Sequence, residues 1–170
     1  SSVTNLRMTF EDARKFNQDI SGWDVSSVID MGLTFVRAQE FNQDISSWDV
    51  SSVTTMDYLF WAAYDFNQDI SGWDVSNVTT MVEMFYLASG LSDANKCAIH
   101  SSFQNNDAWP HSNWSNNCYQ FQTKADLQTA VDLWVSDNTS ALDTYGEINT
   151  WDVSMITDMS DLFKDKSTFN

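Results

Sequence analysis

Basic residues are scarce in this chain of 170 residues. Eight Lys and Arg stand against 24 Asp and Glu, which gives a net charge of −16. Nucleic-acid binding depends on basic side chains that neutralise phosphates, so that class of partner is excluded. Anionic membrane surfaces are disfavoured for the same reason. The longest apolar runs fall well short of the ~18 residues that cross a bilayer, and we expect no membrane insertion of this segment.

Glycine is also scarce, with five residues, and motifs that carry chemistry are missing. The sequence has no glycine-rich phosphate-binding loop, no G-x-S-x-G and no H-E-x-x-H. Paired carboxylates can be catalytic, but here they recur at a fixed period, and such a repeat brings carboxylates together without forming a catalytic pocket. We therefore expect no enzymatic activity and no cofactor. The 42% hydrophobic and 14% aromatic content predicts a folded chain, because so much ring surface must be buried.

Repetition is what the sequence has in abundance. Three copies share a 13-residue stretch: FNQDISGWDVSSV from Phe16, FNQDISSWDVSSV from Phe41 and FNQDISGWDVSNV from Phe66. The full copies cover 16–40, 41–65 and 66–90. Residues 1–15 match the second half of a copy, and INTWDVSMITDMSDLFKD restores the pattern at 148–165. A fixed period of this length indicates stacked repeats. The pattern begins and ends within a repeat, which we interpret as an excerpt of a longer array.

Apolar positions recur in every copy and predict columns of a shared core. In the first full copy they are Phe16, Ile20, Trp23, Val25, Val28, Met31, Phe35 and Ala38. Ile20-x-x-Trp23-x-Val25 has the spacing of a leucine-rich repeat, in which the last part is a short strand. Met31, Phe35 and Ala38 have the spacing of one helix face. We therefore predict an α/β repeat fold, a right-handed leucine-rich-repeat-like solenoid with one short strand and one short helix per 25-residue coil.

The unit FNQDISGWDVSSV, followed by Met, Phe and Ala at fixed positions, resembles the repeat of BspA-type leucine-rich-repeat surface proteins. The resemblance covers residues 1–90 and 148–170. It implies an extracellular or cell-surface array with roles in adhesion, host or matrix binding and the construction of surface layers. The implied partners are neighbouring repeats or modules of the same or identical chains, and a host, matrix or cell-surface ligand. We expect a non-enzymatic structural or adhesion segment of a longer cell-surface or filament protein.

Residues 91–147 interrupt the repeats. Ser92 or Asp93 can cap a helix that begins there, and TKADLQTAVDLWVS predicts a second helix with Leu127 and Val131 turned inward. A polar, aromatic stretch between them holds the only proline, Pro110, and predicts a loop. We interpret 91–147 as degenerate coils or an insert within a single solenoid over 1–170, which has regular repeats over 1–90 and again over 148–170.

Both cysteines, Cys97 and Cys118, lie in this interruption, together with both histidines, His100 and His111. The four side chains form a candidate zinc site, but six residues separate His111 from Cys118, unlike the tight spacing of structural zinc sites. Two cysteines in a surface-type repeat protein favour a disulfide that staples a long loop, with free thiols as a further alternative. In a eukaryotic source, the candidates for glycosylation are Asn113, Asn138 and Asn77.

Two acidic positions recur in every copy, although stacking the copies would bring their like charges together. The first column is Asp24, Asp49, Asp74 and Asp152, and the second is Asp19, Asp44, Asp69 and Glu147. Adjacent coils bring these carboxylates close together, where like charges repel. Either each Asp accepts hydrogen bonds from the next serine or backbone amides, as in an Asx turn, or cations such as calcium bind along the column. The second reading makes the chain a calcium- or ligand-binding module with an acidic strand face. Asn17 and Gln18 are expected to satisfy turn backbone groups between coils.

Overall fold

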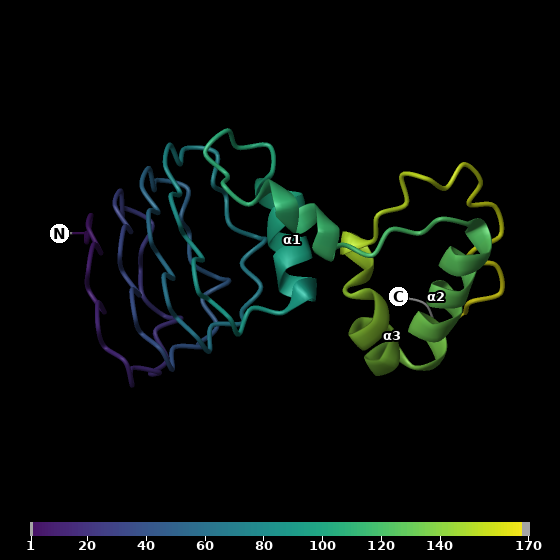
Figure 1. Ribbon diagram of the computed structural model, residues 1–170, viewed down its shortest axis with the longest axis horizontal. Coiled ribbons are helices and arrows are strands. Elements are labelled where there is room, and N and C mark those ends of the chain that lie inside the picture. The colour runs from purple at the N-terminus through teal and green to yellow at the C-terminus, as the bar shows by residue number, and fades with distance from the viewer. Residues whose placement is uncertain (1, 168–170) are drawn as a thin grey trace.

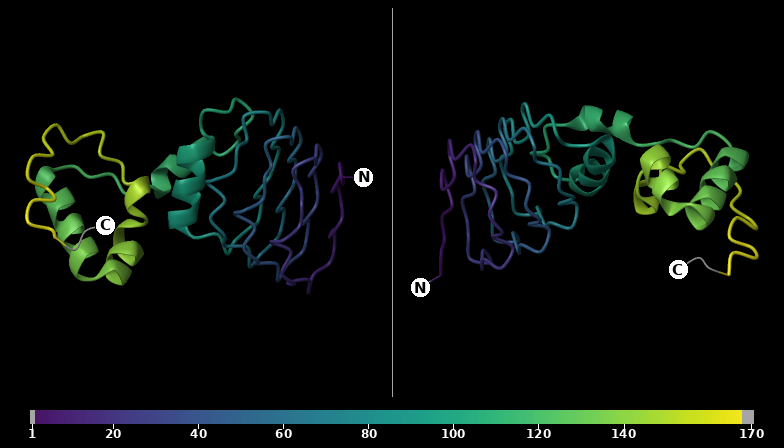
Figure 2. Two further views of the ribbon diagram at one scale, coloured as in Figure 1. Left: turned by 180° about the vertical axis from the view of Figure 1, so that it is seen from behind. Right: turned by 90° about the horizontal axis from the view of Figure 1, so that it is seen from below.

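The computed structural model describes residues 2–167, apart from the side chains of residues 116 and 117. Residues 2–92 form turns and extended segments that lie side by side in successive layers (Figure 1). The helices follow: α1 (Asp93–Phe103), α2 (Lys124–Ser136), α3 (Asn138–Tyr145) and two short 3-10 helices, η1 (Ser112–Asn117) and η2 (Ile148–Thr150). Both views of Figure 2 place α1 against the last layer and α2 and α3 in a second body beyond it.

The predicted α/β leucine-rich-repeat-like solenoid, with a strand and a helix in each coil, is wrong. Within residues 2–167 the backbone forms helices and turns but no strand, and residues 23–25 pair with no neighbouring backbone as a sheet. Parallel pairing is limited to isolated bridges. They join Asn5 to Asp30, Asp30 to Thr55, Thr55 to Thr80, and Gln120 to Asp152. Residues 31–38, where a helix was predicted, are a run of linked turns.

Left-handed residues explain why these segments are not helical. Leu33 and Arg37 have φ angles of 60° and 56°, and a residue in this conformation interrupts a right-handed helix. The same two positions are left-handed in the other repeats: Met8, Asp12, Tyr58, Ala62, Glu83, Leu87, Asp161 and Asp165. The apolar i, i+4, i+7 spacing therefore belongs to linked turns. Like a helix, these turns place residues three or four positions apart on the same face.

The backbone hydrogen bonds of these turns alternate between neighbours in sequence and neighbours in the stack. The amides of Leu33, Phe35 and Arg37 donate to the carbonyls of Asp57, Leu59 and Trp61 in the next copy, over 2.8, 3.0 and 2.8 Å. The amides of the intervening residues 34, 36 and 38 donate to carbonyls three residues earlier. Each layer is thus bonded to the next at every second residue without forming a sheet.

Glycine at a left-handed position is expected to be tolerated. Glu83 is exposed and has a φ of 47°, a conformation that costs a non-glycine residue roughly 1–2 kcal/mol. We expect Glu83→Gly to leave the free energy of unfolding unchanged or to raise it, because relief of this cost offsets the entropy that glycine loses. Val82→Gly, one residue earlier and not left-handed, is expected to lower it by about 1 kcal/mol. Urea unfolding of both variants tests this, and equal destabilisation would contradict it.

The predicted columns of core residues are confirmed in the second and third copies, whereas Trp23 in the first copy is 44% exposed. Phe35, Phe60 and Phe85 form one column of rings, with centroid separations of 5.5 and 5.4 Å. Phe41 and Phe66 form a second column, with centroids 6.2 Å apart, and the ring of Phe66 lies 3.9 Å from that of Phe60. All five side chains are buried, so stacking the copies is what removes these rings from water.

The repeated asparagines join neighbouring layers through side-chain hydrogen bonds. The Oδ1 atom of Asn17 accepts from the amide of Asn42, Asn42 from that of Asn67, and Asn67 from that of Ser92, each over 2.9 Å. The Nε2 atom of Gln68 donates to the carbonyl of Asn42 over 3.0 Å. The prediction that this Asn-Gln pair satisfies turn backbone groups between copies is confirmed for Asn17 and, in the third copy, for Gln68.

Both helices predicted in the interruption are confirmed. Ser92 caps α1 by accepting from the amide of Asn95. Thr123 and Asp126 form a reciprocal capping box at the start of α2, and the inward positions Leu127 and Val131 are buried. Helix α3 is not predicted from the sequence. It begins after a cap at Asp137 and ends before Gly146, whose φ is 73°.

The repeat that resumes at 148–165 adopts the same turns in different surroundings. Its residues Asp161 and Asp165 are left-handed, and its amides close the same turns onto residues three earlier, as from Leu162 to Met159. Here the repeat packs on α2 around a second core that contains Phe121, Leu127 and Trp151. The same turn conformation thus forms in a repeat that packs on α2.

Candidate functional site

The first acidic column is built into the turns. One carboxylate oxygen of Asp24 accepts from the amide of Ser26 over 3.2 Å and from its hydroxyl over 2.6 Å. Asp49 makes the same pair of bonds to Ser51, over 3.1 and 2.6 Å. Asp74 and Asp152 accept from the amides two residues ahead, those of Ser76 and Ser154, over 3.0 and 2.9 Å. These are the Asx turns that the sequence allowed as the structural alternative.

The second column repeats the arrangement. Asp19, Asp44 and Asp69 accept from the amides of Ser21, Ser46 and Ser71, each over 2.9 Å. The carboxylates of both columns are exposed or half-buried. Within residues 2–167, no three His, Cys, Asp or Glu side chains come together to hold a metal ion. Calcium binding by either column stays a prediction that no contact in the structure favours.

Local hydrogen bonding has a larger effect on these carboxylates than the repulsion between neighbouring aspartates, in both acidic columns. Bonds from the Ser51 hydroxyl and amide hold the pKa of Asp49 below its ordinary value, while Asp74 and Asp24 act in the opposite direction with smaller effects. The pKa of Asp44 is likewise lowered, first by the Ser46 hydroxyl and then by its amide, against a smaller effect of Asp19. The turn contacts therefore account for the repeated aspartates without a bound cation.

Removal of one turn acceptor is expected to destabilise the stack. We expect Asp49→Ala to lower the Tm by about 2–4 °C, because the amide and hydroxyl of Ser51 lose their acceptor. Asp49→Asn keeps an acceptor oxygen and is expected to stay closer to the wild-type Tm. A rise in Tm for both variants at low salt would instead identify the column as a purely repulsive one.

The effect of this acceptor has a defined pH dependence. The pKa of Asp49 is lower in the folded state, so its contribution is present above the unfolded value near 3.9 and is lost as the pH falls through the folded value. The Tm difference between wild type and Asp49→Ala should therefore shrink in acid, which thermal melts at neutral and acid pH can measure.

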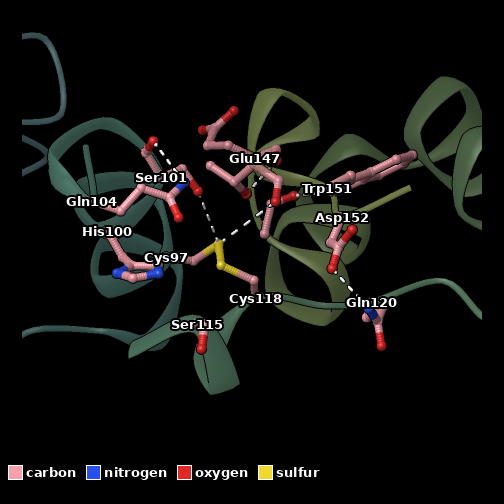
Figure 3. Close-up of a disulfide and its surroundings, with 12 residues drawn as sticks. Cys97, His100, Ser101, Gln104, Ser115, Cys118, Gln120, Glu147, Trp151 and Asp152 are labelled. Carbon is pink, nitrogen blue, oxygen red and sulfur yellow. Dashed lines mark hydrogen bonds between the residues drawn. A yellow bond between two sulfur atoms is a disulfide. The ribbon is translucent and has the colours of Figure 1, made fainter. Parts of the chain in front are cut away.

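Cys97 and Cys118 form a disulfide, with an S–S distance of 2.04 Å and Cα atoms 4.9 Å apart. Figure 3 shows it between α1 and the segment that carries Glu147 and Trp151. The Cys97 sulfur also lies 3.5 Å from the carbonyl oxygen of Thr150. Residues on both sides of the disulfide line a cavity of about 300 Å³. The bond thus lies where the stack with α1 meets the second body.

The two histidines lie in an aromatic cluster that covers the end of the phenylalanine column. The Nδ1 atom of His100 accepts from the Nε1 atom of Trp109 over 3.0 Å. The ring of His111 stacks on Trp114, with centroids 4.5 Å apart, and lies 5.9 Å from Phe85. Burial lowers the pKa of His111 to about 4, so this ring is neutral at pH 7. With both sulfurs in the disulfide, the cluster lacks the thiolates that the zinc hypothesis requires.

The three glycosylation candidates differ in surroundings. Asn113 in η1 and Asn138 at the start of α3 are exposed. Asn77 is exposed too, but its Nδ2 atom donates to the carbonyl of Ser51 in the preceding copy over 2.8 Å. Glycosylation of these residues stays a prediction.

Trp61 and Tyr86 form a partly exposed aromatic column that the sequence does not predict. Trp61 stacks on Tyr86, with centroids 6.1 Å apart, and the guanidinium of Arg37 lies 5.9 Å from the centre of the Trp61 ring. Arg37 is held by two hydrogen bonds of 2.6 Å to the carboxylate of Asp12. The sequence does mark this position by its variation: it is Val36, Trp61 and Tyr86 in three otherwise similar copies.

The fold and these contacts define a repeat protein whose 25-residue units stack through linked turns. The chain belongs to a family described as Mycoplasma protein of unknown function, DUF285, whose model matches residues 1–98 and 137–170. No curated protein and no solved structure matches the sequence. In residues 2–167, no helix has the length and apolar character needed to cross a membrane.

Proposed function

We propose that the chain is a non-enzymatic structural or adhesion segment of a longer extracellular, cell-surface or filament protein of the BspA type. The stacking of its copies supports this proposal most strongly. The repeated asparagines and aromatic residues hold the copies together, and the repeated aspartates stabilise the turns within each copy. A unit whose repeated residues form its own stack suits a scaffold that presents a surface, as repeat proteins do.

The disulfide supports an extracellular location. Disulfides form and persist in oxidising compartments and are rare in reducing ones. The bond between Cys97 and Cys118 joins α1 to the segment after η1. In this proposal it maintains the junction of the two bodies outside the cell, where neighbouring repeats of the same chain and a matrix or cell-surface ligand are the partners.

Labelling of intact cells tests the location and role together. We expect an antibody against the chain to stain intact source cells, and a membrane-impermeant maleimide to label its cysteines there only after reduction. Beads coated with the chain are expected to adhere to cells or matrix more than beads coated with the Phe60→Ala variant, whose core is disrupted. Staining only after permeabilisation, or labelling without reductant, would overturn the extracellular proposal.

A further inference from the structure

Variation among the three full copies is confined almost entirely to one half of the repeat. The 13 residues from Phe16 differ from their counterparts at only two positions, whereas the twelve residues that follow vary at most positions. The constant half supplies the asparagine side-chain bonds between layers and the aspartate bonds within turns, whereas the backbone amides of the variable half donate to the next layer. The variable half carries exposed apolar side chains in the last copies: Tyr64, Val82, Tyr86 and Leu87. In repeat proteins, constant positions maintain the scaffold and variable exposed positions form the binding surface.

The aromatic column within this half is rigid and incompletely covered. Tyr86 is 50% exposed although Trp61 stacks on it. The ring of Trp61 is fixed between Tyr86 and Arg37, and Arg37 is fixed by Asp12. Tyr64, three residues after Trp61, is 41% exposed. Aromatic rings held in advance lose little conformational entropy when a ligand stacks on them, and exposed apolar groups gathered on one segment mark interaction sites.

The charges around the column favour a neutral ligand. Asp65 and Glu83 lie in the same segments, and with the net charge of −16 they disfavour nucleic acids and acidic polysaccharides. The Arg37 guanidinium over Trp61 is paired with the carboxylate of Asp12, so its charge is not available to a charged ligand.

The backbone of this surface disfavours an extended peptide. The amides of Tyr58, Phe60 and Ala62 donate to the carbonyls of the next layer, so they are not free to pair with an added strand. A sugar ring needs no such pairing: its C–H face stacks on an aromatic ring, and its hydroxyls bond to tyrosine hydroxyls, which donate and accept.

We propose that the aromatic column of Trp61 and Tyr86 binds a neutral polysaccharide, with one sugar ring stacked on Tyr86 as the next member of the column. This inference rests on the proposed adhesive role and names its ligand class. It does not depend on where the protein is found, so a failure of the cell-labelling experiment and a failure of glycan binding are separate results.

Native electrophoresis in gels that contain a soluble glycan tests the proposal with the whole chain. The probes are a β-glucan, a mannan and a xylan as neutral polysaccharides, with heparin and alginate as anionic ones. We expect retardation by at least one neutral glycan, none by the anionic pair, and an affinity at least tenfold weaker for Tyr86→Ala. Tyr119→Ala, which removes a tyrosine of similar exposure from another surface, is the matched control and is expected to bind as wild type does. Thermal melts establish that both variants fold.

Other outcomes overturn the proposal. No retardation by any of the three neutral glycans, or equal retardation of wild type and Tyr86→Ala, would reject it. Self-association in sedimentation velocity that Tyr86→Ala abolishes would assign the surface to a second copy of the chain. Retardation by heparin or alginate alone would reject the argument from charge.

Discussion

Replacement of Phe60 by alanine is expected to lower the free energy of unfolding by about 3–5 kcal/mol. The Phe60 ring is fully buried and contacts four other rings: Phe35, Phe66, Trp73 and Phe85. Truncation leaves a cavity in the middle of the stack, where layers on both sides are held by backbone hydrogen bonds and can collapse only partly. Urea unfolding followed by tryptophan fluorescence measures the loss.

Phe163 provides a matched control, because it occupies the same repeat position in the segment that resumes at 148–165. Its ring is 44% exposed, and Phe163→Ala is expected to cost about 1 kcal/mol or less. Equal losses for the two variants would mean that residue type, rather than stacking between layers, determines the contribution of this position.

Removal of the disulfide is expected to have the next largest effect. The bond closes a loop with a sequence separation of 21 residues, for which the chain-entropy model gives roughly 3 kcal/mol. We expect Cys97→Ala/Cys118→Ala to lose about this much stability relative to the oxidised protein. The loop contains Phe103 and Trp109, which are buried in the first core, so the loss should appear in unfolding of the stack and α1.

Reductant supplies the control for this prediction. Wild type should become as unstable as the double variant when it is reduced, and the double variant should not respond. A wild-type protein that is insensitive to reductant under denaturing conditions would show that the two sulfurs are not bonded.

The core of the stack could be predicted from the sequence, and its backbone conformation could not. Apolar columns follow from the repeat because copies in register bury the same positions, as Phe35 and Phe60 do. The helix predicted at 31–38 failed because the i, i+4, i+7 spacing is shared by a helix and by linked turns. Leu33 and Arg37 are left-handed without being glycine, so residue type gave no sign of the turns.

Within the candidate sites, the local chemistry was predictable and the surface was not. The Asx turns of Asp24 and Asp49 involve residues two apart, a range that sequence patterns report well. The contact of Trp61 with Tyr86 joins residues from different layers. Predicting this contact requires two pieces of information: that residues 25 apart are stacked, and that this variable position is exposed. The exposure is known only from the structure.

Amide hydrogen exchange measured by NMR tests the stacking of the copies most directly. The amides of Phe35, Tyr58 and Phe60 donate to the next layer over 3.0, 2.8 and 2.8 Å, and each lies in the variable half, so its signal can be told apart from those of the other copies. We predict slow exchange at all three, with protection approaching that of global unfolding. Rapid exchange at these amides, in a protein that is otherwise folded, would contradict the stack of hydrogen-bonded 25-residue layers.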